Sequence, residues 1–352
     1  MSKTLQTLGL VPFFVQQVVE EGLSLDRLAR VSSVQRSITT VITENAELQL
    51  ELAPTLRDAA ALDRPTVGDW VLIDEAQTRI EKVLERKSLF KRVGAGSNTD
   101  IQPIAANIDT LFIVSSCNEE FKESRLERYL SLCSEAGAEA VIVLTKTDLT
   151  DNLDSYIKRA RSVQHDIAVE TVNAFDHSTL NNVRAWISKN SSIALVGSSG
   201  VGKSTLLNAL ADEQLVATGD IREQDKKGRH TTTYRSLVKL PSGGLMIDVP
   251  GMRELKVADI EQAITHVFAD IEQLARRCQF KNCQHMSEPG CAVRTALENG
   301  ELESRRLNSY HKLLRENAQA TATLAQKRSQ AKDLAKIIKK AKSIKSHKGH
   351  KR

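Results

Sequence analysis

The chain reads Gly197-Ser198-Ser199-Gly200-Val201-Gly202-Lys203-Ser204 near its middle, a complete G-x-x-x-x-G-K-[ST] phosphate-binding loop. The apolar run Ile193 to Val196 precedes it, and Thr205-Leu206-Leu207-Asn208-Ala209-Leu210 follows with the composition of a helix. In such a strand-loop-helix unit, backbone N–H groups from Gly197 to Thr205 surround the phosphates, Lys203 bridges the β- and γ-phosphates, and the Ser204 hydroxyl binds Mg²⁺. We therefore predict an α/β nucleotide-binding domain here, the alternative being a Gly/Ser-rich turn that contains Lys-Ser by chance.

A second motif indicates which base is bound. Thr145-Lys146-Thr147-Asp148 follows the apolar run Val141 to Leu144 and matches the [NT]-K-x-D pattern of guanine recognition. The Asp148 carboxylate can accept from both N1–H and the 2-amino group of guanine, and ATP would leave it unpaired. The prediction is GTP and GDP rather than ATP, although T-K-x-D also occurs by chance. Because Thr145 replaces the commoner Asn, it is expected to give up that amide's contacts to the P-loop and to the base.

Two further motifs complete a magnesium site. Asp248-Val249-Pro250-Gly251 follows the apolar run Leu245 to Ile247 and matches D-x-x-G, whose aspartate holds Mg²⁺ through water. Between it and the P-loop lies Gly228-Arg229-His230-Thr231-Thr232-Thr233, where Thr232, with Thr231 as the alternative, is predicted to bind Mg²⁺. Base recognition therefore precedes the P-loop and the two switch segments, whereas ordinary GTPases carry it last. This order predicts a circularly permuted domain whose second switch leads directly into the C-terminal region.

Hydrolysis needs an oriented water molecule, and the residue after the D-x-x-G glycine is Met252. A thioether cannot orient water, unlike the glutamine that many signalling GTPases place there. His230 is the candidate for this task, beside Lys203 and Thr232 as the other catalytic residues. A role of His230 in packing or partner contact is an equal alternative. Slow intrinsic turnover is expected.

A cysteine cluster predicts a metal site. Cys278-x₄-Cys283-x-His285-x₅-Cys291 supplies three thiolates and one imidazole, the donor set of a closed tetrahedral Zn²⁺ site. Since protein ligands would fill all four positions, one structural zinc ion is predicted, with buried free cysteines as the alternative. Cys117 and Cys133 stand alone in α/β segments and are expected to be core residues.

Composition and charge bear on location and partners. The chain has 352 residues, is 41% hydrophobic and 26% charged, and contains no apolar run long enough for a membrane span. It shows no export signal, so we expect a cytoplasmic protein with reduced cysteines. Residues 327–352 hold eleven Lys or Arg against one Asp, a net charge of +10, so the remainder of the +5 chain carries −5. This basic tail indicates a polyanionic partner such as RNA, the alternative being a solvated chain end. Because aromatic residues make up only 4% of the chain, RNA is expected to be recognised by its shape and backbone rather than by base stacking.

The pattern of runs along the chain predicts a multidomain α/β plus β protein. Short alternating runs within residues 35–105 indicate an OB-like β-barrel after an extension over 1–34. Apolar strands alternate with helical stretches, such as Glu123 to Ala136 and Thr179 to Lys189, in the circularly permuted P-loop domain over 106–262. A helical zinc-binding domain over 263–326 and a basic tail over 327–352 follow. The alternating runs of the barrel are Ser37 to Thr43, Leu48 to Ala53, Asp69 to Ile73 and Thr78 to Leu84.

The motifs together resemble the ribosome small-subunit-dependent GTPase A family, the RsgA/YjeQ circularly permuted GTPases. The shared blocks include Arg125-Leu126-Glu127-Arg128-Tyr129-Leu130, G-R-H-T-T, D-V-P-G-M-R-E-L from Asp248 to Leu255 and the cysteine cluster. The resemblance implies an OB fold, a zinc domain, and a factor that binds the small (30S) ribosomal subunit and its rRNA late in assembly. It also implies GTP hydrolysis stimulated by the subunit and release in the GDP state. We expect a monomer that binds neither DNA nor membranes; a nucleotide-gated RNA-binding module with incidental hydrolysis is the alternative.

Overall fold

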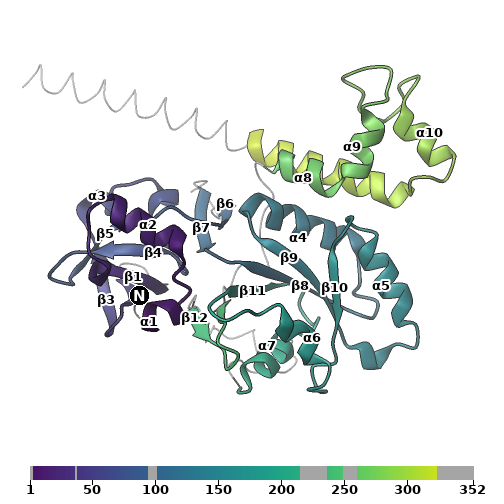
Figure 1. The fold of residues 1–352 in the computed structure, drawn as a ribbon. Helices are drawn as coiled ribbons and strands as arrows, with labels where there is room; N and C mark the ends of the chain where they lie inside the picture. The colour runs from purple at the N-terminus through teal and green to yellow at the C-terminus, as the bar shows by residue number, and fades with distance from the viewer. Residues whose placement is uncertain (1–2, 36–37, 94–100, 215–235, 249–259, 323–352) are drawn as a thin grey trace, which may run out of the picture.

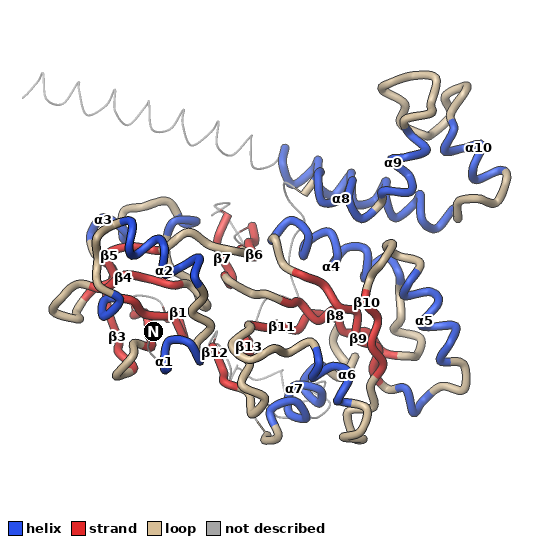
Figure 2. The backbone as a smooth tube through the Cα atoms, in the orientation of Figure 1, coloured by secondary structure: helices blue, strands red, loops and turns tan. Residues whose placement is uncertain are grey.

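The computed structural model describes residues 3–35, 38–93, 101–214, 236–248 and 260–322. Three groups of elements follow one another along these residues: a β-barrel, an α/β sheet and a set of C-terminal helices (Figure 1). The barrel and the C-terminal helices lie on different sides of the α/β sheet, as the tube in Figure 2 shows. No helix in the described ranges is long and apolar enough to cross a bilayer.

The N-terminal barrel has five strands, β1 (Leu28–Gln35), β2 (Ile38–Ile42), β3 (Glu47–Leu52), β4 (Trp70–Ile73) and β5 (Arg79–Val83). Their order is β1-β2-β3-β5-β4, β3 and β5 are parallel, and antiparallel pairing of β4 with β1 closes the ring. The four predicted alternating runs correspond to β2 through β5, and the predicted barrel is confirmed. β1 lies in the segment that the sequence assigned to an extension, because the charged Arg30 interrupts its apolar run.

Arg30 is buried where the N-terminal segment, the barrel and the α/β sheet meet. Its guanidinium donates to the Leu8 carbonyl, to the Gly68 carbonyl at 3.3 Å and to the Ser192 hydroxyl at 2.7 Å. Burial lowers the pKa of Arg30 to about 10. Two helices, α1 (Lys3–Thr7) and α2 (Pro12–Glu20), complete this region, and Phe14 of α2 packs against Trp70 of β4 in a cluster separate from the barrel interior.

The α/β sheet contains β8 (Thr110–Ser116), β9 (Glu139–Thr145), β10 (Ala168–Thr171), β11 (Ser192–Val196), β12 (Ser236–Lys239) and β13 (Leu245–Asp248). Its order is β10-β9-β8-β11-β13-β12, and only β12 is antiparallel to its neighbours. Side chains of alternate strand residues face two separate cores. Helices α4 (Glu123–Ala136) and α5 (Leu153–Arg161) cover one face, and α6 (Leu180–Ala185) and α7 (Lys203–Ala211) cover the other.

The helix predicted from Thr179 to Lys189 is shorter than expected, since α6 ends at Ala185. The N–H groups of Trp186 and Ile187 donate to the carbonyls of the third residue before each, which tightens the chain into a turn. Asn190 then adopts a φ of 68°, which directs the chain into β11. Residues 186–191 therefore form the connection between α6 and β11 and not a further helical turn.

The barrel and the α/β sheet are joined by strand pairing and by packing. A two-stranded ribbon of β6 (Leu89–Val93) and β7 (Ile101–Ala106) connects them along the chain, and β1 pairs with β12. Leu237 of β12 and Leu245 of β13 belong to the same apolar cluster as Trp70. Gly68, with a φ of 89°, is so close to the ribbon and to the sheet that a Cβ would lie 2.2 Å from the Ala106 carbonyl oxygen of the ribbon and 2.8 Å from Ile247 Cδ1 of β13.

The C-terminal helices pack on α4. They are α8 (Glu261–Val267), α9 (Ala269–Ala275), α10 (Ala292–Glu298) and a helix over residues 304–322. Ile264, Phe268 and Tyr310 share a core with Leu126 and Leu130 of α4. One of the two apolar cores of the α/β domain therefore continues into the C-terminal helices, and Figure 1 shows α8 lying along α4.

Candidate nucleotide and metal sites

The predicted phosphate, base and magnesium motifs lie at one edge of the sheet. Thr145 ends β9, the P-loop follows β11 and Asp248 ends β13. These strands are parallel, so their carboxyl ends meet at the same edge, where open α/β sheets bind ligands. His230, Thr231 and Thr232, together with residues 249–252, lie outside the described residues.

The P-loop turns closely around the end of the sheet. Gly197 has a φ of 151°, and a Cβ on it would lie 2.3 Å from the Val114 carbonyl oxygen of β8. Only glycine fits this approach between two backbones. The Lys203 ammonium donates to the carbonyls of Gly197, at 2.9 Å, and of Ser198, so it lies across the loop. Ser204 is half-buried in the first turn of α7, at the end where a helix attracts phosphate.

Thr145 links the base-recognition segment to the P-loop. Its buried hydroxyl donates to the Val201 carbonyl at 2.6 Å. A threonine lacks the amide that asparagine would offer, but its hydroxyl makes one contact with the P-loop from the end of β9. Lys146 follows with a left-handed φ of 57°, and Asp148 is exposed in a short 3₁₀ turn, Thr147–Leu149. The Asp148 carboxylate is thus accessible to a ligand beside the P-loop.

Another loop at this edge was not identified from the sequence. β10 pairs in parallel with β9, so the residues after β10 lie beside the base-recognition segment. Asn173 accepts from the Phe175 N–H at 3.1 Å, and the Thr179 hydroxyl donates to the Asn173 carbonyl at 2.9 Å. The available signal was the Asn and Asp content of residues 173–179, which is typical of side-chain-stabilised turns.

Arg125 of α4 also reaches the P-loop, a contact that motif spacing does not reveal. Its Nη1 donates to the Ser198 hydroxyl at 2.6 Å and lies 3.2 Å from the Glu120 carboxylate. The only sequence signal was the position of Arg125 at the start of the R-L-E-R-Y-L block. The structure thus places a cation from a neighbouring helix against the phosphate loop.

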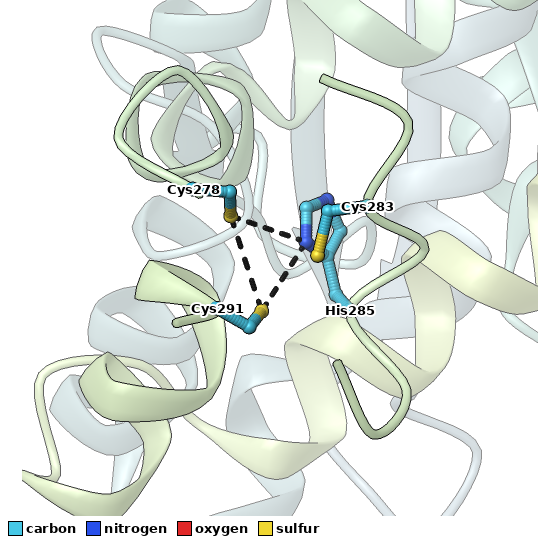
Figure 3. Close-up of side chains that lie close together, drawn as sticks. All are labelled: Cys278, Cys283, His285 and Cys291. Carbon is cyan, nitrogen blue, oxygen red and sulfur yellow. Dashed lines mark hydrogen bonds between the residues drawn. The ribbon is translucent and has the colours of Figure 1, made fainter. Parts of the chain in front are cut away.

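The four predicted metal ligands come together in space. The ligand atoms of Cys278, Cys283, His285 and Cys291 all lie within 4.8 Å of one another (Figure 3). Cys291 Sγ is 3.5 Å from His285 Nδ1 and 3.9 Å from Cys278 Sγ. Cys117 and Cys133 are buried in the core near α4, as predicted, and burial raises the pKa values of their thiols to about 11 and about 12.

Side chains around the cluster fix the loop that carries His285, whose φ is 60°. The Glu288 carboxylate accepts from the N–H groups of Gln284, Met286 and Ser287, which lowers its pKa to about 2. Arg294 donates to the Met286 carbonyl at 2.8 Å. The arrangement orients the imidazole toward the thiols through its own loop contacts.

Comparison with known proteins decides the family. The chain is 46% identical, over 98% of its length and 94% of the relative's, to "Small ribosomal subunit biogenesis GTPase RsgA 2" of Vibrio parahaemolyticus. A model of the RsgA GTPase family matches residues 83–258. This chain belongs to the RsgA GTPase family. The matched span contains all the predicted RsgA nucleotide motifs, in the permuted order found in the sequence.

Solved structures agree with this RsgA-family assignment. The crystal structure of YjeQ from Thermotoga maritima has a TM-score of 0.60 and 26% identity, and covers 82% of this chain and 98% of that one. A structure described as YloQ, a circularly permuted GTPase, has a TM-score of 0.59 and 24% identity, and the match covers 83% of this chain and 95% of that one. This second match shows a similar fold. The predicted fold class, a barrel, a permuted P-loop domain and a helical Cys₃His domain, is confirmed.

Proposed function

We propose that this chain hydrolyses GTP to GDP and phosphate and acts in the biogenesis of the small ribosomal subunit. The observation that carries the proposal is the near full-length similarity to proteins named small ribosomal subunit biogenesis GTPases. It is supported by an intact P-loop and by an accessible Asp148 at the same edge of the sheet.

The proposed roles follow from the motif to which each residue belongs and, for the described residues, from its position. The P-loop amides and Lys203 hold the β- and γ-phosphates, and the ammonium exchanges its two carbonyl partners for phosphate oxygens when nucleotide enters. Asp148 pairs with the N1–H and 2-amino groups of guanine, and Lys146 lies over the base. Thr145 and Thr147 complete that segment. His230 orients the attacking water, with Lys203 and Thr232 stabilising the charge that develops on the phosphate.

Two metal ions belong to this proposal. Ser204, Thr232 and Asp248 hold Mg²⁺, which neutralises charge on the phosphate oxygens. Cys278, Cys283, His285 and Cys291 hold one structural Zn²⁺. Two thiolates on a tetrahedral zinc with bonds of ~2.3 Å lie roughly 3.8 Å apart, close to the 3.9 Å between Cys278 Sγ and Cys291 Sγ.

The remaining parts of the proposal concern the ribosome. A monomer in the cytoplasm binds the small subunit through rRNA, using the barrel, the zinc domain and the basic tail over 327–352, and not DNA. Domain divisions near residues 105, 262 and 326 are part of this proposal, while the barrel includes β1 (Leu28–Gln35) and so begins before the predicted division at residue 34. Hydrolysis, stimulated by the subunit, releases the protein in the GDP state. The eleven basic residues of the tail neutralise rRNA phosphates and release their counterions. The affinity for the subunit therefore falls as the salt concentration rises.

The deciding experiment measures GTP turnover by the purified chain with and without small ribosomal subunits. Strong stimulation by small subunits, specific for GTP over ATP and absent in Lys203→Ala, is the expected result. Large subunits serve as the control for non-specific binding to rRNA. Turnover that does not respond to the small subunit would contradict the proposal, and equal turnover of ATP would contradict the guanine assignment.

One observation favours a second candidate, a nucleotide-gated RNA-binding module in which hydrolysis is incidental. Met252 stands where a water-orienting residue is common, and its side chain cannot orient water. In that case GTP and GDP would change the affinity for small subunits without any stimulation of turnover. Measuring subunit affinity with GDP and with a non-hydrolysable GTP analogue, beside the turnover assay, separates the two functions.

A further inference from the structure

The side chain of Arg125 on helix α4 contacts the P-loop. The Arg125 guanidinium donates to the Ser198 hydroxyl at 2.6 Å, while the Ser198 carbonyl accepts from Lys203. Ser198 is therefore held by two cations, one from within the P-loop unit and one from another helix. A hydrogen bond from a charged donor is stronger than one between neutral groups, so this contact restrains the loop.

The same helix anchors the C-terminal domain through a different side chain. Glu127 is fully buried, and its Oε1 accepts from Arg305 and from Arg306, each at 2.9 Å. Arg306 also donates to the Val267 carbonyl at 2.8 Å and forms two hydrogen bonds with Asp270. A buried carboxylate with this many arginine contacts ties the position of α4 to that of the C-terminal helices.

Arg125 and Glu127 are two residues apart on one helix, so their side chains leave it in nearly opposite directions. One direction leads to the phosphate loop and the other to the C-terminal domain. The α4 backbone between them is rigid because its apolar residues Leu126 and Leu130 are packed in the core. A small movement of α4 relative to the sheet therefore changes both contacts together.

We propose that Arg125 is a positioning residue for the P-loop, and that through α4 it makes nucleotide affinity depend on the docking of the C-terminal domain at Glu127. This inference rests on the proposed function, since it concerns the binding of guanine nucleotide by the same loop. It adds a route that is separate from the second switch segment. By thermodynamic reciprocity, nucleotide binding then changes the docking of the C-terminal domain by the same factor.

The first test is a double-mutant cycle on GDP affinity, measured with a fluorescent GDP analogue. Arg125→Ala and Ser198→Ala should each weaken binding about tenfold, the value of one charge-assisted hydrogen bond. The double variant should be no weaker than either single one, because both remove the same contact. Arg125→Lys should bind GDP more tightly than Arg125→Ala does. In Arg125→Ala, KM for GTP should rise while kcat stays unchanged.

Glu135→Ala is the matched control, because Glu135 lies on the same helix but pairs with Lys91 of β6 and not with a C-terminal helix. It should leave GDP affinity within about twofold of the parent. Variants that bind like the parent, or losses that simply add in the double variant, would overturn the inference while leaving the proposed function intact. A parent chain that binds no guanine nucleotide would instead remove the proposed function, and the inference with it.

The second test asks whether the C-terminal contact acts through Arg125. Arg305→Ala removes one of the two arginines on Glu127 and leaves Arg306 to pair the carboxylate, so the fold is retained. It should weaken GDP binding about threefold in the parent. In the Arg125→Ala background the same change should have no effect. Equal effects in the two backgrounds would show that the contact does not act through Arg125.

Discussion

Replacement of Arg306 by alanine should separate the C-terminal helices from the α/β domain. The Arg306 side chain is only 6% exposed, and it donates to Glu127 Oε1 at 2.9 Å and to the Val163 carbonyl at 2.7 Å. Its guanidinium also lies over the Phe268 ring, 4.3 Å from the centroid. Alanine removes every one of these contacts and leaves buried acceptors without their donor.

The loss of unfolding free energy in Arg306→Ala depends on which partners of Arg306 keep another hydrogen-bond partner. Breaking a buried ion pair by removing one partner costs about 3–5 kcal/mol. Arg305 still pairs with Glu127, and the Asp270 side chain is 48% exposed and can be hydrated. These two facts place the expected loss at the lower end, about 3 kcal/mol. The Arg305 side chain is 32% exposed, so Arg305→Ala should lower the free energy of unfolding by only about 1 kcal/mol.

Urea unfolding followed by far-ultraviolet circular dichroism, with zinc present throughout, measures both variants against the parent. Limited proteolysis provides a second readout, because undocked C-terminal helices would uncover the face of α4 that carries Leu126 and Leu130. A loss below about 1 kcal/mol for Arg306→Ala would refute the reasoning. So would equal losses for the two arginine variants, since burial would then not determine the cost.

Three further outcomes are expected. Gly197→Ala should weaken GDP binding more than Gly200→Ala, because its Cβ would lie 2.3 Å from a backbone oxygen whereas that of Gly200 meets nothing within 4 Å; equal losses in titrations with labelled GDP would contradict this. Asp148→Asn should weaken GTP and GDP at least about tenfold, and ADP binding by the parent equal to GDP binding would argue against guanine selection. Metal analysis should find zinc at one ion per chain, with Cys291→Ser lowering both zinc content and melting temperature; a zinc-free chain of unchanged stability would exclude the metal site.

Much of the fold could be predicted because the deciding residues act locally. The Gly-rich loop requires particular backbone angles, and the apolar runs around it have the lengths of buried strands. The cysteine cluster gathers within fourteen residues of sequence, so its spacing alone brought the four ligands together. Helix α4 was predicted with its observed limits, Glu123–Ala136, since Gly137 ends it with a left-handed φ of 76°.

The parts that could not be predicted depend on contacts between distant segments. Strand β1 carries the buried Arg30, which is acceptable only because acceptors from residues 8, 68 and 192 surround it. The link between Arg125 and Ser198 spans 73 residues, and the link between Glu127 and Arg306 spans 179. No local pattern encodes such pairs. The hydroxyl of Thr145 likewise reaches the P-loop only after the sheet has formed.

The barrel and the C-terminal helices are attached to different elements of the nucleotide domain. The barrel and its N-terminal helices share an apolar cluster with Leu237 of β12 and Leu245 of β13, the strand that ends at Asp248. The C-terminal helices instead share a core and buried ion pairs with α4, which contacts the P-loop. Strand β13, which ends at Asp248, is thus tied to both appended domains, because Ile247 lies in the core that contains the C-terminal helices, whereas Ser198 is linked to those helices through Arg125 and Glu127 of α4.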